Sequence, residues 1–376
     1  MPGIKRYVDR RSGLPSEGYR LSIDPGKIVI TGADYGGLFN GIQTLRQLFP
    51  GGEGKKATQQ GGKIFPKENN NTPLVLITME LPCLLIEDYP RFGYRGMHLD
   101  VARTFSTKED VMRYIDNMSR YKINKFHWHL TDDEGWRIEI KAYPKLTGTG
   151  AFRGGDSPVM PIYGKWNERY GGYYTQDEIR EVVEYAAVRN VEIIPEIDLP
   201  GHSRAAALSY PELLCATPPD TLSSGGYDRR NVWCVSREEN YEMLDSIFSE
   251  IMRLFPSEYI HIGGDEVEFE QWSGCPHCQE LATKEGLKDG RQLQYHFMKR
   301  LEGIIARHGR MSAVWNEAIN GGELPATVRV HGWENVKVCR EAASKGYSTV
   351  VMPGSSFYFD MKYAKGEPGM QWAGIV

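Results

Sequence analysis

The sequence of 376 residues lacks an excess of charge of one sign. Lys and Arg together number 45 and Asp and Glu number 49, which gives a formal net charge of −4. A balance so close to neutrality provides no electrostatic attraction for nucleic acid or for an anionic membrane. We therefore expect no nucleic-acid partner and no membrane partner, and a small, weakly charged ligand instead.

Long hydrophobic runs are also missing. The longest apolar stretch, residues 74–86, is interrupted by Glu80 and Pro82 and is too short to span a bilayer. The first twenty residues are basic and contain no apolar segment of the kind found in secretory signals. These absences predict a soluble protein and leave its localisation open.

Cysteine is scarce, because six cysteines in a chain of this length do not make a disulfide scaffold. Cys275 and Cys278 have the C-x-x-C spacing of half a zinc site, but no second pair follows at a suitable spacing. Cys215 and Cys234 bracket a loop that contains Pro and Gly, and they could be bridged. We expect no metal and no cofactor, and the sequence does not settle whether either pair is bridged.

From Tyr94 onward, short apolar strands alternate with amphipathic helices. This repeat predicts parallel strands, and at this length it favours an α/β fold of the (β/α)8 TIM-barrel type. A doubly wound open sheet is the alternative, but no G-x-G-x-x-G follows any strand. We expect strands at 95–101, 125–131, 192–198, 259–264, 312–317, 327–333 and 348–352, and helices at 108–121, 177–190, 241–255, 292–308 and 336–345.

Seven strands leave such a barrel one strand short. We therefore expect a TIM barrel that lacks strand 8, either because the C-terminus is missing or because the closing strand is unusual. An open barrel would expose two sheet edges and would lose the substrate contacts that strand 8 supplies.

A smaller α/β domain is expected ahead of the barrel. Residues 18–30 alternate like two short strands joined by a Pro-Gly turn, residues 34–49 have helical spacing, and another strand follows near 81–87. Residues 51–72 are poor in apolar side chains and rich in Gly, Asn, Gln and Lys, which indicates a mobile loop. We place the small domain at 1–90 and the barrel at 91–376.

Polar or aromatic residues follow every predicted strand of the barrel. The C-terminal ends of barrel strands meet at one rim and form the active site. Carboxylates, an Arg and several aromatic rings are costly to bury there without a ligand, and together they are typical of a sugar pocket. In strand order, these groups are Asp100 and Arg103; His127, His129, Asp132 and Asp133; Glu196, Asp198 and His202; Asp265 and Glu266; Trp315 and Glu317; His331, Trp333 and Glu334; and Tyr358, Asp360 and Trp372.

Two of these strand ends have residue patterns that suit ligand or metal binding. Gly263 and Gly264 precede the adjacent acids Asp265 and Glu266, and glycines allow a ligand to approach the backbone closely. His127 and His129 lie on one face of a strand and could bind a metal in a hydrolase together with Asp198 and His202. We expect His127 and His129 to be hydrogen-bonded core groups rather than metal ligands. The metal-bridging lysine and further strand-end histidines of such a hydrolase are hard to find in order.

Four segments carry a resemblance to a known family. They read YRGMHLDVAR at 94–103, KFHWHLTDD at 125–133, IPEIDLPGH at 194–202 and HIGGDE at 261–266. In this order they resemble the β-N-acetylhexosaminidases of glycoside hydrolase family 20, and the resemblance runs from about Tyr94 to the end. The preceding segment resembles the C-terminal half of the small α/β domain that precedes the barrel in that family, whose first strands we expect to be absent.

The resemblance implies an exo-acting hydrolase of terminal non-reducing β-linked N-acetyl-D-hexosamine, GlcNAc or GalNAc. In that family the substrate's own acetamido oxygen is the nucleophile, and an oxazolinium intermediate leads to retention. By similarity, Glu266 would be the general acid and then the base, with a pKa raised by burial and by Asp265. Asp265 would accept the acetamido N–H and Tyr358 would donate to the acetamido oxygen, while Asp198 and His202 would orient Glu266.

The same resemblance implies a set of substrate-binding residues. The guanidinium of Arg103 and the carboxylate of Asp132 would hold sugar hydroxyls, a geometry that suits a vicinal diol. The aromatic walls around the acetamido methyl and the sugar ring would be Trp315, Trp333 and Trp372, and Asp360 would reach a further hydroxyl.

Three alternatives stay open at this point. The chain could be a fragment of a longer hexosaminidase with reduced or no activity unless a partner fills the gap, or a carbohydrate-binding fragment that has lost turnover. A metal-dependent barrel hydrolase is the third. The sequence does not distinguish GlcNAc from GalNAc, and it leaves the natural substrate and the oligomeric state open.

Overall fold

A computed structural model describes residues 3–49, 63–65, 74–76, 80–157, 159, 165, 167–215 and 231–371. The chain divides into two compact units. One comprises Met1–Arg95, Ile115–Asn124 and Val188–Val191, and the other comprises Gly96–Tyr114, Lys125–Ala187 and Glu192–Val376. No helix among the described residues is long and apolar enough to cross a membrane.

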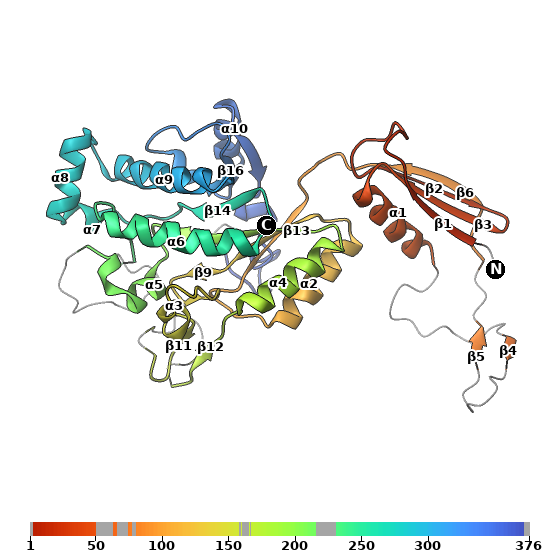
Figure 1. Cartoon of the computed structure of the whole chain (residues 1–376), viewed down its shortest axis with the longest axis horizontal. Helices are drawn as coiled ribbons and strands as arrows, with labels where there is room; N and C mark the ends of the chain where they lie inside the picture. The colour runs from red at the N-terminus through yellow and green to blue at the C-terminus, as the bar shows by residue number, and fades with distance from the viewer. Residues whose placement is uncertain are drawn as a thin grey trace. The chain divides into compact units, whose positions relative to one another are not determined.

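The first unit contains a four-stranded sheet in the order β1-β3-β2-β6 with one long helix against it (Figure 1). The predicted hairpin is present, and Gly26 in its turn has a φ of +83°. The helix begins where the Asp34 side chain accepts a hydrogen bond of 2.8 Å from the backbone N–H of Gly37. Its elements are β1 (Gly3–Val8), β2 (Tyr19–Asp24), β3 (Lys27–Gly32), α1 (Tyr35–Leu48) and β6 (Leu84–Asp88).

Apolar side chains of this sheet and its helix form the core of the first unit. Tyr19, Leu21, Ile23, Ile28, Ile30 and Leu45 are buried together. The loop predicted over 51–72 lies outside the described residues, except that β4 (Lys63–Phe65) pairs antiparallel with β5 (Leu74–Leu76).

The second unit is built on seven parallel strands in the order β17-β16-β15-β14-β13-β8-β7. All seven predicted strands are present, and each bound lies within two residues of the expected one. The central strands β8, β13 and β14 are buried on both faces, as parallel strands covered by helices should be. The strands are β7 (Gly96–Asp100), β8 (Lys125–His129), β13 (Glu192–Leu199), β14 (Tyr259–Gly263), β15 (Met311–Trp315), β16 (Arg329–Gly332) and β17 (Ser348–Val351).

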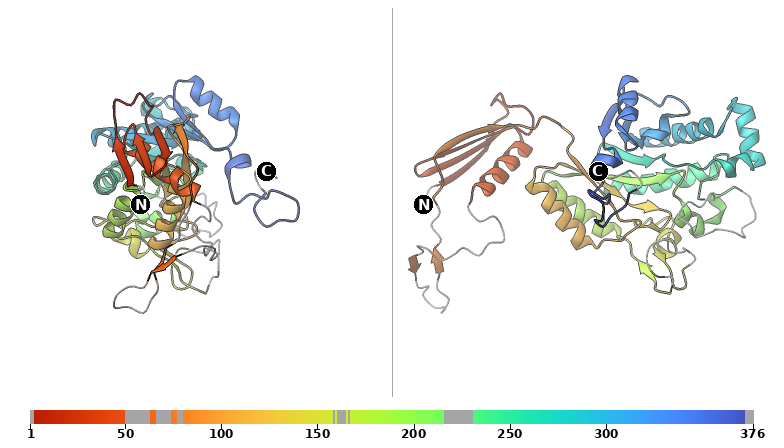
Figure 2. Two further views of the ribbon diagram at one scale, coloured as in Figure 1. Left: turned by 90° about the vertical axis from the view of Figure 1, so that its right-hand side faces the viewer. Right: turned by 180° about the vertical axis from the view of Figure 1, so that it is seen from behind.

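Among the described residues β7 and β17 are the two edges of this sheet, so the strands form an incomplete TIM barrel. Helices connect consecutive strands except β15 and β16, between which lies only the short 3-10 helix η2 (Asn316–Ile319), and α6 packs against both α4 and α9 (Figures 1 and 2). The side chains of Asp289 and Asn335 cap the two helices that follow them. The helices are α2 (Lys108–Arg120), α4 (Gln176–Ala187), α6 (Glu238–Leu254), α9 (Gly290–Arg307) and α10 (Val336–Ser344).

Shorter elements lie in the connections between the strands. After α11, residues 358–371 form a largely exposed loop that extends away from the helices in the left view of Figure 2. The short elements are β9 (Thr131–Asp132), β10 (Gly135–Trp136), α3 (Lys145–Gly148), β11 (Phe152–Arg153), β12 (Tyr170–Gly171), α5 (Arg204–Ser209), η1 (Pro211–Leu213), α7 (Glu270–Ser273), α8 (Pro276–Glu285), η2 (Asn316–Ile319) and α11 (Gly354–Phe357).

Candidate active site

The tip of β14 brings two acids against the end of β13. Gly263 and Gly264 have φ values of +69° and +102°, a backbone conformation that suits glycine. A β-carbon at Gly263 would lie 1.9 Å from Oδ1 of Asp198, so the glycine makes room for that carboxyl group. Asp265 and Glu266 follow directly and lie at the carboxyl ends of the strands, as the sequence predicted for this rim.

His202, which follows β13, lies close to these two acids and to Asp132, which follows β8. Its Nε2 lies 3.5 Å from Oδ2 of Asp265 and 3.4 Å from Oε2 of Glu266. Its Nδ1 lies 3.2 Å from Oδ1 of Asp132. Burial opposes the charged imidazolium, but the carboxylates of Asp132 and Asp265 outweigh it and hold the pKa of His202 well above its usual value. A positive charge therefore stands between the acids.

Glu266 departs from the expectation of a raised pKa. Its contact with His202, at 3.4 Å, lowers the pKa of its carboxyl group, and this effect exceeds the opposing effect of burial. The side chain is 38% exposed, so it keeps part of its contact with water. The expectation was wrong because it considered only burial and Asp265, whereas the fold places a cationic imidazole beside the carboxylate.

The pKa is raised in two neighbouring acids instead. Burial is the main cause for both Asp198 and Asp265, and the charge of Asp265 adds to it at Asp198. The effect is larger at Asp198, where the pKa lies well above the usual range. Burial therefore favours the neutral carboxyl form more strongly at Asp198 than at Asp265.

Arg103 is surrounded by three acids. Its guanidinium lies 2.7 Å from Asp132, 2.9 Å from Asp100 and 3.4 Å from Glu134, and a third of its side chain is exposed. Asp132 has only 1% of its side chain exposed, which places it beneath Arg103. Burial and the charge of Asp132 raise the pKa of Glu134 to about 7. Of the two residues predicted to hold sugar hydroxyls, Arg103 is partly exposed to solvent, whereas Asp132 is buried and forms an ion pair with it.

A buried carboxylate, Glu196, lies under this rim. Its oxygens lie 2.9 Å from Nε2 of His127 and 2.9 Å from Nδ1 of His261, and Oε2 forms a 2.5 Å hydrogen bond with Nδ1 of His129. Burial lowers the pKa of His127 to about 3, so that imidazole is neutral. The prediction of a hydrogen-bonded core group holds for His129, while His127 contacts the carboxylate without the alignment of a hydrogen bond.

The aromatic side chains after β15 and β16 differ in position. Trp315 is 5% exposed and its ring stacks on that of His127, with 5.4 Å between centroids, so it lies in the interior below the rim. Trp333 is partly exposed, and its indole Nε1 donates a 3.1 Å hydrogen bond to Oε2 of Glu317. Oε1 of Glu317 accepts one of 3.3 Å from the backbone N–H of Glu266.

Glu317 was not assigned a role from the sequence, although it lies two residues after Trp315 at a strand end. The structure makes it a link between the indole of Trp333 and the backbone of Glu266. Burial and the charge of Asp265 raise its pKa to about 8. Its position after an apolar strand placed it among the strand-end residues in the sequence, but that pattern does not show which groups it contacts.

Of the three residues predicted beyond β17, one joins this group. Tyr358 is partly buried, and burial followed by the charge of Asp265 raises the pKa of its hydroxyl. Asp360 is exposed on the loop after it. Trp372 lies outside the described residues.

Comparison with known proteins shows that both parts of the chain match domains of one family. Residues 92–376 match the catalytic domain of glycosyl hydrolase family 20, and residues 4–89 match domain 2 of the same family. The chain belongs to glycosyl hydrolase family 20. The α/β fold class predicted from the sequence, an incomplete TIM barrel preceded by a small α/β domain, is confirmed.

Similar family 20 proteins come from several bacteria. All of this chain aligns with a β-hexosaminidase of Vibrio furnissii at 39% identity. A segment covering 97% of this chain aligns with a β-hexosaminidase of Porphyromonas gingivalis at 36% identity. Among solved structures, 99% of the chain superposes on an exo-β-N-acetylglucosaminidase from Vibrio harveyi in complex with N-acetylglucosamine, with a TM-score of 0.84 and 37% identity. The chain covers 55% of that structure, and 58% and 43% of the two curated relatives.

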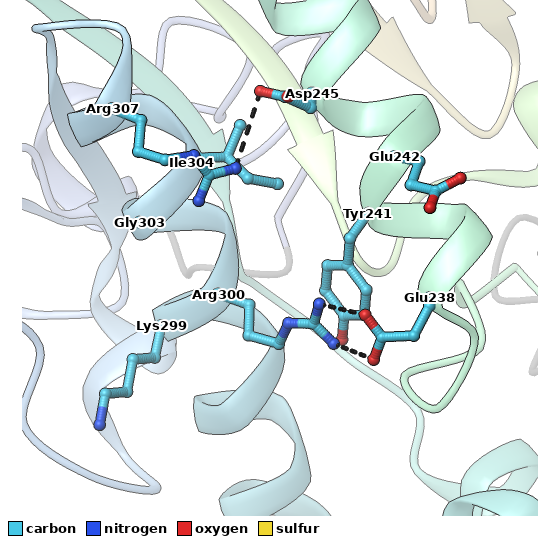
Figure 3. Close-up of a pocket in the computed structure, with 9 residues that line it drawn as sticks. All are labelled: Glu238, Tyr241, Glu242, Asp245, Lys299, Arg300, Gly303, Ile304 and Arg307. Atoms are coloured by element: carbon cyan, nitrogen blue, oxygen red, sulfur yellow. Dashed lines mark hydrogen bonds and ion pairs between the residues drawn. The ribbon is translucent and has the colours of Figure 1, made fainter.

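A surface depression between α6 and α9 is distinct from the family 20 site. Four of its charged groups pair with one another: Arg300 forms two hydrogen bonds to Glu238, of 2.6 and 2.5 Å, and Arg307 lies 3.8 Å from Asp245 (Figure 3). The guanidinium of Arg300 also lies over the ring of Tyr241. The depression contains none of the predicted site residues and lies on the outer helices, so we assign it no chemistry. Its lining residues are Glu238, Tyr241, Glu242, Asp245, Lys299, Arg300, Gly303, Ile304 and Arg307.

Proposed function

We propose that the chain carries the active site of an exo-acting β-N-acetylhexosaminidase, which hydrolyses terminal β-linked N-acetylhexosamine with retention through an oxazolinium intermediate. The observation that carries the proposal is the arrangement of Asp265 and Glu266, adjacent at the tip of β14 and both within 3.5 Å of His202. Membership of family 20 supports it, as does the N-acetylglucosamine bound to the Vibrio harveyi relative.

Substrate binding would begin with Arg103 and Trp333. The exposed part of the Arg103 guanidinium can donate to sugar hydroxyls while the three acids around it fix its orientation. The indole of Trp333, held by Glu317, offers a flat face to the sugar ring or to the acetamido methyl. Asp132 would act on the substrate through Arg103, because almost none of its side chain is exposed.

In the first chemical step, the acetamido carbonyl oxygen attacks the anomeric carbon as the bond to the leaving oxygen breaks. Glu266 gives its proton to that leaving oxygen. Positive charge develops on the acetamido group, and Asp265 would accept its N–H and stabilise that charge. Tyr358 would donate a hydrogen bond to the acetamido oxygen and aim it at the anomeric carbon. Two adjacent acids suit this division, because the leaving oxygen and the acetamido nitrogen are close together on the sugar.

Glu266 must be protonated for this step, although its pKa is lowered in the free chain. A bound sugar would cover the exposed part of its side chain, and loss of water favours the neutral acid. After the leaving group departs, the ionised Glu266 takes a proton from water. That water attacks the anomeric carbon, opens the oxazolinium ring and restores the β configuration.

The test compares leaving groups. In Glu266→Gln the turnover of an N-acetylglucosaminide with a poor leaving group should fall by about 10²- to 10⁴-fold, the usual contribution of a general acid. With 2,4-dinitrophenol, which needs little protonation, the loss should be much smaller. Asp265→Asn should slow both substrates, because it weakens assistance by the acetamido group rather than protonation.

Glu242→Gln, an exposed change on α6, is the control and should leave both rates unchanged. Equal losses for both leaving groups in Glu266→Gln would contradict its role as acid. Hydrolysis of a glucoside without the acetamido group at a similar rate would contradict substrate assistance.

Catalytic competence of the chain by itself is a separate question. We propose that an eighth strand completes the sugar pocket, because β7 and β17 are the open edges of the described sheet. The chain and a version extended at its C-terminus by an eighth strand should then differ in turnover. Equal turnover would contradict this proposal. Binding of N-acetylglucosamine by both without turnover by either would favour a carbohydrate-binding protein.

A further inference from the structure

Four cysteines from two separate loops converge in the second unit. Cys215 and Cys234 lie in the connection after β13, and Cys275 and Cys278 lie at the start of α8, after β14. Their sulfur atoms all lie within 4.8 Å of one another, and all four side chains are buried, with exposures of 5% or less. We call these residues the four-cysteine cluster.

The spacing of the sulfur atoms fits a shared metal ion better than disulfide bonds. Sγ of Cys278 lies 3.6 Å from Sγ of Cys215 and 3.6 Å from Sγ of Cys234. Thiolates bound tetrahedrally to Zn²⁺ at about 2.3 Å lie about 3.8 Å apart, whereas the sulfurs of a disulfide lie about 2.05 Å apart. One sulfur equidistant from two others has no single partner, which is expected at a tetrahedral site.

The local backbone prepares these thiols for a cation. Cys275 is the N-cap of α8 and Cys278 lies in its first turn, where the helix dipole favours thiolate. The backbone N–H of Cys234 donates a 2.8 Å hydrogen bond to the carbonyl of Leu213, which holds the two arms of the first loop together. Ser236 Oγ lies 3.3 Å from Sγ of Cys234 and 3.5 Å from Sγ of Cys278, where its hydroxyl can stabilise thiolate charge.

We propose that the four-cysteine cluster is a structural Zn²⁺ site that joins the loop after β13 to the loop after β14. Four thiolates fill a tetrahedral zinc shell, so the site has no open position for catalysis. The sequence pointed away from zinc because no second pair follows Cys278. The second pair precedes it, 41 and 60 residues before Cys275.

A zinc ion in the four-cysteine cluster would hold in place a segment that contacts the active site. Asn231 donates hydrogen bonds of 2.9 and 2.8 Å to the two carboxylate oxygens of Asp133. The backbone N–H of Trp233 donates to the carbonyl of Pro200, two residues before His202. The indole of Trp272, in the β14 loop, donates a 2.9 Å hydrogen bond to the carbonyl of Trp233. Zinc at Cys234 would therefore fix the segment that supports His202.

Metal content and thiol state provide the first test, and neither depends on the activity proposed above. The chain, purified without a metal-affinity tag and dialysed, should contain about one zinc per chain by elemental analysis. After acid denaturation its mass should correspond to six reduced cysteines. A chain without zinc whose mass has lost the hydrogens of one or two bridges would overturn the proposal.

Variants and a spectroscopic probe provide the second test. Cys278→Ser should lose the zinc, and Cys339→Ser should keep it, because Cys339 is equally buried but lies in α10 outside the cluster. If Cys278→Ser does not fold, the unmodified chain loaded with Co²⁺ decides. Tetrahedral thiolate ligation should give intense visible and near-ultraviolet absorption that equimolar Zn²⁺ abolishes, and the absence of such bands would overturn the proposal. So would equal zinc in folded Cys278→Ser.

Discussion

Asp198 and Gly263 lie so close together that Oδ1 of the acid occupies the space in which a β-carbon on the glycine would lie, 1.9 Å away. Gly263 also has a φ of +69°, which a residue with a side chain adopts only at a cost. The carboxyl group at the end of β13 and the turn that presents Asp265 and Glu266 therefore depend on each other.

Gly263→Ala should be strongly destabilising. Strain at this φ costs about 1–3 kcal/mol, and displacement of Asp198 adds to it. We expect a lower midpoint in urea unfolding and a loss of turnover. Gly303→Ala is the matched control, because a β-carbon there meets nothing within 4 Å inside helix α9. It should raise stability by about 0.5–1 kcal/mol, and similar destabilisation by both variants would contradict the prediction.

Asp198→Asn should change how stability depends on pH. The pKa of Asp198 is raised in the folded chain, mainly by burial and then by the charge of Asp265. The folded chain thus holds a proton that the unfolded chain releases near pH 4, so this group lowers stability as pH rises above that value. Urea unfolding of the variant should show a smaller loss of stability between pH 5 and pH 8. Asp177→Asn is the control, because the side chain of Asp177 is 88% exposed, and it should lose as much stability over this range as the wild type. An equal loss of stability in Asp198→Asn and Asp177→Asn would contradict the prediction.

His202→Gln should shift the pH dependence of turnover. Contact with His202 lowers the pKa of Glu266, so removal of the imidazole should raise it. Because the proposed general acid works only when protonated, the fall of kcat/KM at high pH should move to higher pH, with a reduced maximum rate. His308→Gln, whose imidazole contacts Asp245 on the outer helices, should leave the profile in place. A fall that moves to lower pH in His202→Gln would contradict the assignment.

Glu317→Gln should weaken substrate binding more than catalysis. Above pH 8, where Glu317 is ionised, the amide keeps only one acceptor oxygen for the indole of Trp333 and the backbone N–H of Glu266, so one hydrogen bond is weakened. A loss of about 0.5–1.5 kcal/mol corresponds to a rise in KM of about 2- to 10-fold. Glu317→Ala removes both acceptors and should also lower kcat, whereas Glu280→Gln, exposed on α8, should change neither. An unchanged KM in Glu317→Ala would refute the link.

The barrel strands could be predicted because their apolar runs, buried on both faces in the central strands, are separated by amphipathic helices. Strand β1 could not, because Gly3–Val8 is exposed along its whole length and shows no alternation. The rim residues followed from the strand ends and from the family motifs. Their roles and the domain boundary near residue 90 stay predictions.

What the sequence could not show are contacts between distant segments. The pKa of Glu266 depends on His202, 64 residues earlier, and the position of Asp132 beneath Arg103 depends on how two strands end. The four-cysteine cluster likewise unites residues from two loops. Periodicity reports the local environment of a residue, whereas these features arise only when the sheet is assembled.

Strand β13 limits how this protein can be engineered. Glu196 and Asp198 are two residues apart, and both lie close to His129. Deletion of a residue before Glu196 would put Ile197 in the place of the carboxylate that contacts the interior imidazoles, and an insertion there would put Pro195 or the new residue in that place. Either change would also move Asp198 away from Asp265. Libraries designed to change substrate preference should therefore leave β13 unvaried and diversify the loops that follow the strands.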